Sequence, residues 1–254
     1  MDAVVIAGGI PKPEEPLYSY TQGQPKALVD VAGKPMAQWV LEALDGAHHV
    51  ERILLIGVDE GSGLSCTKPV AYYPSQGGML ENILFGIKQV SARDAGAKHV
   101  LLVSSDIPGI KPEMVDWVVS NALKTDDDLY YHLITQAVME QRYPTSKRTY
   151  TRLKDAVVCG GDMNVVAVRA VNSSLDKWEQ LIGARKNPLK QASIIGLDTL
   201  LLLALRLMTV QGAVKKVSRR LGMTGRAVLC PFAEVGMDVD KPHQLELMRI
   251  DLEG

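Results

Sequence analysis

Short apolar runs recur along the chain, and each is bounded by glycine, proline or aspartate. Runs of about four to six residues without polar alternation are typical of strands that are buried on both faces of a sheet. The five clearest runs span residues 3–7, 53–57, 100–104, 165–168 and 227–230. We predict a strand for each of them.

Segments with apolar residues at helical spacing lie between the first of these strands. The apolar positions are Met36, Val40, Leu41 and Leu44 in the first segment, Leu80, Ile83, Leu84 and Ile87 in the second, and Met114, Val115, Val118 and Val119 in the third. Each set lies on one face of a helix. The alternation predicts an α/β, Rossmann-like fold of three layers, in which helices cover both faces of a mostly parallel central sheet. Ligands of such folds bind beyond the carboxyl ends of the strands.

The middle of the chain has a weaker pattern. Residues 129–136 are compatible with a further strand, whereas residues 140–154 are rich in Arg, Lys, Thr and Tyr and follow neither the strand period nor the helix period. We interpret 140–154 as a mobile loop or excursion near the site.

A long helical pattern follows in the last third of the chain. Residues 173–221 contain no strand signal, and Asn172 and Ser173 are residue types that cap helices. We predict a helical insertion over residues 173–221 within a single domain of residues 1–254, because α/β domains often reach about 250 residues as one unit.

The charge balance excludes one class of partner. The chain has 28 Lys and Arg residues against 29 Asp and Glu, a formal net charge of -1. This balance provides no long-range field for holding a nucleic-acid backbone. With 46% hydrophobic and 22% charged residues, the chain has the composition of a globular domain with a core. We therefore expect small-molecule partners and no nucleic acid; the oligomeric state does not follow from the sequence.

Cysteine usage and the apolar segments indicate a compartment. Cys66, Cys159 and Cys230 form no C-x-x-C pair, which disfavours a disulfide framework or a cysteine zinc site and fits a reducing cytoplasm. The first residues, MDAVVIAGG, lack the basic start and long apolar stretch of a signal peptide. Residues 197–210 are interrupted by two charges and are shorter than the roughly 20 residues of a membrane span, so we expect a buried helix there and no membrane.

Unusual sequences stand beside three of the predicted strands. Ala7, Gly8 and Gly9 follow the first strand, the sequence SSDIP follows the strand at 100–104, and CGGDMN precedes the strand at 165–168. These are the positions at which an α/β fold places its ligands.

The glycine pair suits a phosphate. Gly8 and Gly9 allow the backbone to approach a ligand closely and to adopt positive φ, although an ordinary tight turn has the same requirements. The sequence is not G-x-G-x-x-G, and Pro11 and Pro13 interrupt the helix that a dinucleotide-binding turn would open. A Rossmann cofactor site is therefore disfavoured.

Lys26 is the first candidate for a charged catalytic group. It lies between Pro25 and the apolar residues Ala27 and Leu28. A lysine placed in this way acts as a point charge that neutralises a phosphate during transfer, whereas an isolated lysine is usually solvated.

Aspartates supply the second kind of candidate. Asp106 follows a strand directly, so we expect its carboxylate at the carboxyl edge of the sheet. Asp238 and Asp240 stand near the C-terminal end, where Asp240 is also a plausible helix cap. Mg²⁺ takes one or two protein carboxylates together with substrate phosphates, so Asp106 and Asp240 would suffice. No G-x-S-x-G, H-E-x-x-H or G-x-x-x-x-G-K-[ST] sequence is present, which disfavours hydrolase, zincin and P-loop functions.

Four of these stretches, taken together, resemble a known family. In order along the chain they are VVIAGG, PKALVDVAGKPMAQWVLEAL, SSDIPGI and DVDKPHQLELMR. They resemble the nucleotidyltransferases of the MobA-like and sugar-1-phosphate type. The resemblance implies a GT-A-like fold, Mg²⁺ as cofactor, and transfer of a nucleoside monophosphate from an NTP to a phosphorylated or hydroxyl acceptor with release of pyrophosphate.

The resemblance also implies roles for individual residues. Catalysis falls to Lys26, Asp106 and Asp240, and the metal to Asp106 and Asp240, with Asp238 as a rival ligand. The residues expected to contact the nucleotide are Ala7, Gly8, Gly9, Lys12, Lys26, Gln76, Gly77 and Gly78. Gly161 and Asn164 match the acceptor-binding segment, more loosely.

One departure keeps two other functions open. The family usually continues its glycine pair into a Gly-x-Arg stretch whose arginine contacts the triphosphate, whereas this chain has Ile10, Pro11 and Lys12 there. Lys12 would supply the charge but not the bidentate fork of an arginine. The alternatives are a GT-A glycosyltransferase that uses a nucleotide sugar, and a nucleotide-binding regulatory protein that has lost catalysis.

Overall fold

The apolar runs of the sequence form one central sheet in the computed structural model, which describes residues 1–173 and 196–253. Its strands are β1 (Asp2–Ile6), β4 (Arg52–Ile56), β5 (Val70–Tyr73), β6 (His99–Ser104), β7 (Leu129–Thr135), β8 (Thr151–Arg152), β9 (Val157–Gly160), β10 (Met163–Ala167) and β11 (Gly225–Leu229). Their order is β5-β4-β1-β6-β10-β7-β9-β8, and β11 pairs with β7. A separate small hairpin joins β2 (Asp30–Val31) and β3 (Lys34–Pro35).

The strands run mostly in one direction. β5, β4, β1 and β6 pair in parallel, and β11 is parallel to β7. β10 is antiparallel to both β6 and β7, and β9 is antiparallel to β7 and β8. Among the strands that the structure describes, β9 and β10 therefore run against the rest. The predicted α/β class with a mostly parallel central sheet is confirmed.

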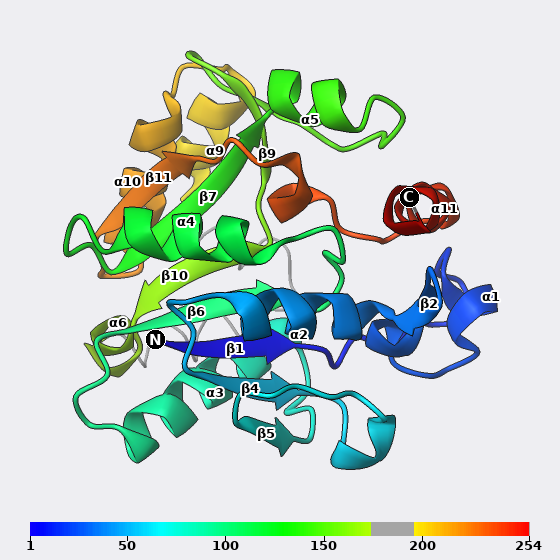
Figure 1. Ribbon diagram of the computed structural model, residues 1–254. Helices are drawn as coiled ribbons and strands as arrows, with labels where there is room; N and C mark the ends of the chain where they lie inside the picture. Colours follow the sequence, from blue (N-terminus) through cyan, green and yellow to red (C-terminus); the bar gives the residue numbers. More distant parts are fainter. Residues whose placement is uncertain (174–195, 254) are drawn as a thin grey trace.

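Helices cover both faces of the sheet (Figure 1). They are α1 (Tyr18–Thr21), α2 (Met36–Gly46), α3 (Met79–Arg93), α4 (Pro112–Ala122), α5 (Gln136–Arg142), α6 (Val168–Ser173), α9 (Leu197–Ala204), α10 (Val210–Arg220) and α11 (Pro242–Glu253). Short 3₁₀ turns span Lys26–Leu28, Glu60–Ser62 and Ala233–Gly236.

Two large apolar clusters join these layers, and a third, small cluster contains Leu133, Val158 and Val210. On one face Val40 and Leu44 of α2 pack in a cluster with Val5 and Val103, and α4 and α11 join the same cluster. On the opposite face α3 and α6 cover a second cluster. Consecutive strand residues alternate between the two clusters, as Val4 and Val5 do, which is why β1 is apolar along its whole length.

Three expectations from the sequence need correction or completion. The interval 140–154 is not a loop throughout, since it contains the end of α5 and all of β8. Asn172 and Ser173 lie in the last turn of α6 rather than before a helix. The insertion predicted at 173–221 contains α9 and α10, while its residues 174–195 lie outside the described part of the chain.

The apolar interval 197–210 is also less buried than expected. α9 ends at Ala204, and Leu201, Leu205 and Leu207 are each more than half exposed. Asp198 of α9 forms an ion pair with Arg220 of α10 at the surface. Within the described residues, no helix is long and apolar enough to cross a membrane.

Gly57 lets the first strand reach the site. It follows β4 with a φ of +108°, and a Cβ there would stand 2.1 Å from the Cα of Gly8. The backbone after β1 therefore crosses the backbone after β4 at a distance that excludes any side chain.

We predict that Gly57→Ala lowers the free energy of unfolding by at least about 2 kcal/mol, because both the positive φ and the contact with Gly8 penalise a Cβ. Gly63→Ala is the matched control: its φ is +76°, but nothing stands within 4 Å of the added Cβ. We expect a loss of only about 1 kcal/mol there. Urea unfolding measures both, and equal losses would contradict the role of the crossing.

Candidate active site

A cleft opens at the carboxyl ends of β1 and β6. It has a volume of about 590 Å³ and lies where an α/β sheet places its ligands. Its lining residues are Ile6, Gly8, Gly9, Ile10, Lys26, Ala27, Ser75, Gly77, Gly78, Met79, Asn82, Ser104, Ser105, Asp106, Asp162, Asp238 and Asp240. Most of the predicted site residues therefore share one cleft, although they come from distant parts of the sequence.

The turn at Gly8 and Gly9 forms one wall. A Cβ on Gly8 would stand 2.8 Å from the Oγ of Ser75, so the glycine is required by close packing. The carbonyl of Gly9 accepts a 2.8 Å hydrogen bond from the backbone N–H of Lys26, which fixes Lys26 beside the turn. In the described residues the amides of Gly8, Gly9 and Ile10 donate to no protein group, so they remain available to a ligand anion.

Lys26 lies between two carboxylates. Its Nζ is 2.5 Å from Oδ2 of Asp106 and 2.6 Å from Oδ1 of Asp240. Burial alone would lower the pKa of Lys26, but the two carboxylates outweigh it and hold that pKa above the ordinary value. Lys26 is therefore a permanent cation, and its charge is the one that joins the two aspartates.

The chain brings Asp106 and Asp240 together through the backbone. Asp106 lies two residues after the end of β6, and its Oδ1 accepts a 2.5 Å hydrogen bond from the Oγ of Ser104. Its carbonyl accepts a 2.9 Å bond from the N–H of Val239, which places the segment before α11 against the end of β6. Asp106 is nearly buried and Asp240 is half exposed, with side-chain exposures of 12% and 55%.

Asp238 takes part in a different ion pair. Its carboxylate pairs with the guanidinium of Arg148, and both side chains are 14% exposed. Arg148 comes from the interval 140–154, which was expected near the site, and it is a residue that the sequence did not single out. Asp238 lines the cleft but is engaged by Arg148, whereas Asp240 shares Lys26 with Asp106.

Asp162 is the most unusual carboxyl group in the cleft. It precedes β10, and its Oδ2 is buried with no hydrogen-bond partner in the described residues. Burial, followed by the negative charge of Asp106, raises the pKa of Asp162 to about 7. CGGDMN was expected at a ligand edge, but Gly161 and Asn164 were predicted as its site residues. The acidic residue directly after two glycines was the available signal.

The loop before α3 forms the opposite wall. Asn82 is buried in α3, and its Oδ1 accepts a 2.6 Å hydrogen bond from the N–H of Gln76. Its Nδ2 donates to the Oγ of Ser75. Gly77 and Gly78 line the cleft, while the side chain of Gln76 is exposed and bonds to the carbonyl of Pro74. Asn82 was not predicted, because a polar residue on an apolar helix face gives no sign of what it holds.

Five predicted residues lie outside the cleft lining, namely Ala7, Lys12, Gln76, Gly161 and Asn164. Lys12 is exposed, and its backbone N–H donates to Glu15. The side chain of Asn164 bonds to the N–H of His132 and to the carbonyl of Gly161, so its amide bridges the backbones of neighbouring strands. Gly161 packs against the carbonyl of His132. Ala7 is buried behind the glycine turn.

The sequence of the chain matches that of a known family. The match to the MobA-like NTP transferase domain spans residues 3–186, which include the glycine turn, Lys26, Asp106 and Asp162. The chain belongs to this family, whose members are nucleotidyltransferases. The resemblance drawn from the four sequence stretches is confirmed.

Solved structures agree with this assignment. A hypothetical transferase from Thermus thermophilus is 31% identical over 96% of this chain and 98% of its own, with a TM-score of 0.81. A CMP:2-keto-3-deoxy-manno-octonic acid synthetase complexed with CTP is 16% identical, covering 99% and 98%, with a TM-score of 0.58. A 4-diphosphocytidyl-2C-methyl-D-erythritol synthase from Anaerococcus prevotii is 11% identical, covering 100% and 96%, with a TM-score of 0.62. The latter two show the fold alone. No curated protein matches significantly.

The raised pKa of Asp162 predicts that the free energy of unfolding depends on pH. The folded pKa of about 7 exceeds the ordinary value of 3.8, so the folded state holds this proton where the unfolded state has lost it. Stability from this group is complete below about pH 4 and is lost as pH rises to 7. Asp162→Asn should therefore stabilise the protein by about 1–3 kcal/mol at pH 8 and by little at pH 4.5. Thermal unfolding at both pH values measures this, and an equal effect at both would contradict the assignment.

Proposed function

We propose that the protein is a Mg²⁺-dependent nucleotidyltransferase that moves a nucleoside monophosphate from an NTP to a phosphorylated or hydroxyl acceptor and releases pyrophosphate. One observation carries the proposal: Lys26 joins Asp106 and Asp240 at the carboxyl edge of the sheet, beside the unengaged amides of the Gly8 turn. Cations and backbone donors around one point are what a polyphosphate needs.

The donor set fits Mg²⁺. Asp106 and Asp240 both reach one atom of Lys26, so their oxygens already converge on a position that a cation occupies. Within the described ranges, no group of three or more His, Cys, Asp or Glu side chains is arranged to hold a metal. Mg²⁺ needs fewer, because it keeps waters and takes the remaining ligands from substrate phosphates. When bound, the ion would neutralise charge on the phosphates.

The residues of the cleft would align the reaction rather than exchange protons. The acceptor oxygen forms the new bond to the α-phosphorus, the bond from that phosphorus to the bridging oxygen breaks, and pyrophosphate leaves with the electron pair. The ammonium group of Lys26 would turn from the carboxylates to the phosphates and supply a positive charge there. Gly8 and Gly9 would donate backbone N–H groups to the same anion, and Gly77 and Gly78 would lie along the nucleotide.

A second hollow adjoins the cleft and changes the assignment of one residue. It has a volume of about 510 Å³, and it shares Gly9, Ile10, Lys26 and Asp240 with the cleft. Lys241 lines this hollow, and Lys12 does not. We therefore assign to Lys241, rather than to Lys12, the positive charge that stands in for the family's missing arginine.

Loss of the cleft carboxylate should slow turnover strongly while preserving the fold. We expect Asp106→Ala to lower the rate of pyrophosphate release by about 10²–10³-fold, because the charges around the phosphates are no longer balanced. Asp126→Ala, which removes an exposed carboxylate paired with Arg169 far along the chain, should leave the rate unchanged. The assay screens four NTPs against phosphorylated acceptors with and without Mg²⁺. Full Mg²⁺-dependent activity in Asp106→Ala would refute the proposal.

The two lysines give a second, paired prediction. Lys241→Ala should raise the Kd for an NTP about tenfold, the value expected from one lost charge-assisted contact. Lys12→Ala should leave it within about twofold. Isothermal titration with Mg²⁺ present measures both constants. A larger effect of Lys12→Ala would return the role to Lys12, while nucleotide binding without transfer to any acceptor would favour the regulatory alternative.

A further inference from the structure

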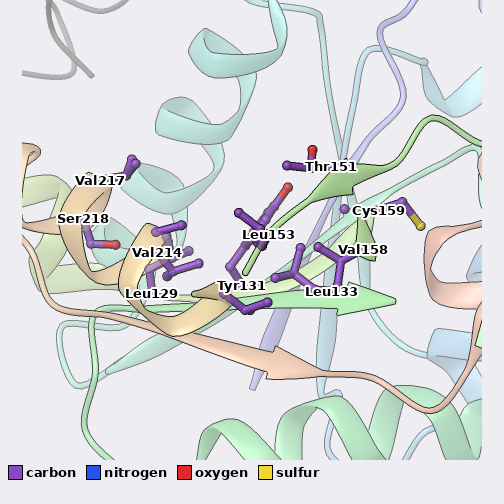
Figure 2. A pocket seen from close by; sticks show the side chains of 13 residues that line it. Leu129, Tyr131, Leu133, Thr151, Leu153, Val158, Cys159, Val214, Val217 and Ser218 are labelled. Atoms are coloured by element: carbon purple, nitrogen blue, oxygen red, sulfur yellow. The ribbon is translucent and has the colours of Figure 1, made fainter. Parts of the chain in front are cut away.

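An apolar pocket lies between α10 and the strands β7 and β9 (Figure 2). Its volume is about 320 Å³. Leu129, Tyr131 and Leu133 of β7 line one side, and Val214 and Val217 of α10 line the other. Figure 2 labels these side chains around the pocket, with Val214 beside Leu129. The described part of α10 thus stands over the strands without filling the gap between them.

The hydroxyl groups of Tyr131, Thr151 and Ser218 interrupt the apolar lining. Ser218 is 1% exposed, and its Oγ has no hydrogen-bond partner among the described residues. Tyr131 brings its hydroxyl close to Gly160, where a Cβ would stand 2.6 Å from that oxygen. The Ser218 hydroxyl packs against Gly225, so Tyr131 is the hydroxyl from which a ligand acceptor atom would gain a hydrogen bond. This combination of apolar walls with a few polar groups is typical of small-molecule sites.

Within the described residues, the pocket and the catalytic cleft share no lining residue, but the turn between β9 and β10 connects them. Gly160 lines the pocket, and Asp162, two residues later, lines the cleft. Burial raises the pKa of Tyr131, and the charge of Asp162 raises it further.

The walls of the pocket come partly from the residues that match the family and partly from α10. The family match ends at residue 186, so α10 lies outside it. Thr151 and Leu153, from the polar interval 140–154, also line the pocket. Substrate selectivity is expected in segments that lie beside the catalytic residues, because function is built onto a fold by the segments around its site.

We propose that this pocket holds an apolar body of the acceptor, whose reacting oxygen extends past Tyr131 into the cleft; this rests on the proposed function. The acceptor class is then an alcohol or phosphomonoester carried on a hydrocarbon group rather than a polar sugar phosphate. The oxygen bonds to the α-phosphorus and pyrophosphate leaves with the electron pair of the broken bond. A hydroxyl acceptor in addition releases its proton to water.

The test uses a series of n-alkyl phosphates from butyl to octyl, with glycerol phosphate as the polar comparison. Binding to the full chain is measured by titration calorimetry, with and without Mg²⁺ and a non-hydrolysable NTP analogue. Each added methylene should tighten binding about fourfold until the pocket is full, from the free energy of burying one CH₂ group. The matching alcohols, run in the transfer assay, show which head group supplies the oxygen.

Variants on one helix separate the pocket from the surface. Ala213→Phe fills the pocket from α10 and should weaken octyl phosphate binding by at least tenfold, whereas Lys215→Phe adds the same ring at an exposed position and should change nothing. Both should bind the NTP analogue as the unmodified chain does. Leu153→Ala enlarges the pocket and should shift the optimum to a longer chain, which keeps the test decisive if Ala213→Phe does not fold.

The outcomes distinguish the two proposals. Equal affinity for butyl, octyl and glycerol phosphates, or equal losses in Ala213→Phe and Lys215→Phe, would overturn the pocket assignment and leave nucleotidyl transfer standing. Absence of pyrophosphate release from every NTP would overturn the proposed function, while chain-length-dependent binding blocked by Ala213→Phe would still establish an apolar ligand site here.

Discussion

The contact on which the site depends is the ammonium group of Lys26 between the carboxylates of Asp106 and Asp240. Two carboxylates that face one point repel each other unless a cation lies between them. Lys26 supplies that cation in the protein alone, and its backbone is tied to Gly9, so the charge stays beside the glycine turn. In the proposed function, Asp106 and Asp240 would hold Mg²⁺ and Lys26 would contact the phosphates of the nucleotide.

The fold supports this contact through close backbone packing. Gly57 allows the chain after β1 to cross the chain after β4, and Gly8 then packs on Ser75, which Asn82 holds in place. The N–H of Val239 bonds to the carbonyl of Asp106 and brings the C-terminal segment to the same edge. Backbone packing and backbone hydrogen bonds thus fix the ends of the strands. For this reason, side chains that are distant in sequence meet at the site.

The sequence predicts the parts of this arrangement that depend on local pattern. The apolar runs located β1, β4 and β6, and hence the carboxyl edge at which Asp106 lies. Asp162 was not predicted, because the direction of its side chain depends on how β10 pairs with β6. In that pairing Met163 lies opposite Val103, and no local sequence pattern sets this register. Arg148 was not predicted, because residues 140–154 follow neither the strand period nor the helix period. Asn164 was selected for its residue type, but its amide is occupied by the backbone of β7 and Gly161.

The central claim is that Asp106 and Asp240 share one cation beside the nucleotide. Electron paramagnetic resonance of Mn²⁺, which substitutes for Mg²⁺ at oxygen ligands, tests it most directly in the presence of a non-hydrolysable NTP analogue. We predict one nucleotide-dependent Mn²⁺ per chain, which is lost when both aspartates are changed to asparagine. Tight Mn²⁺ binding that survives the double substitution would contradict it.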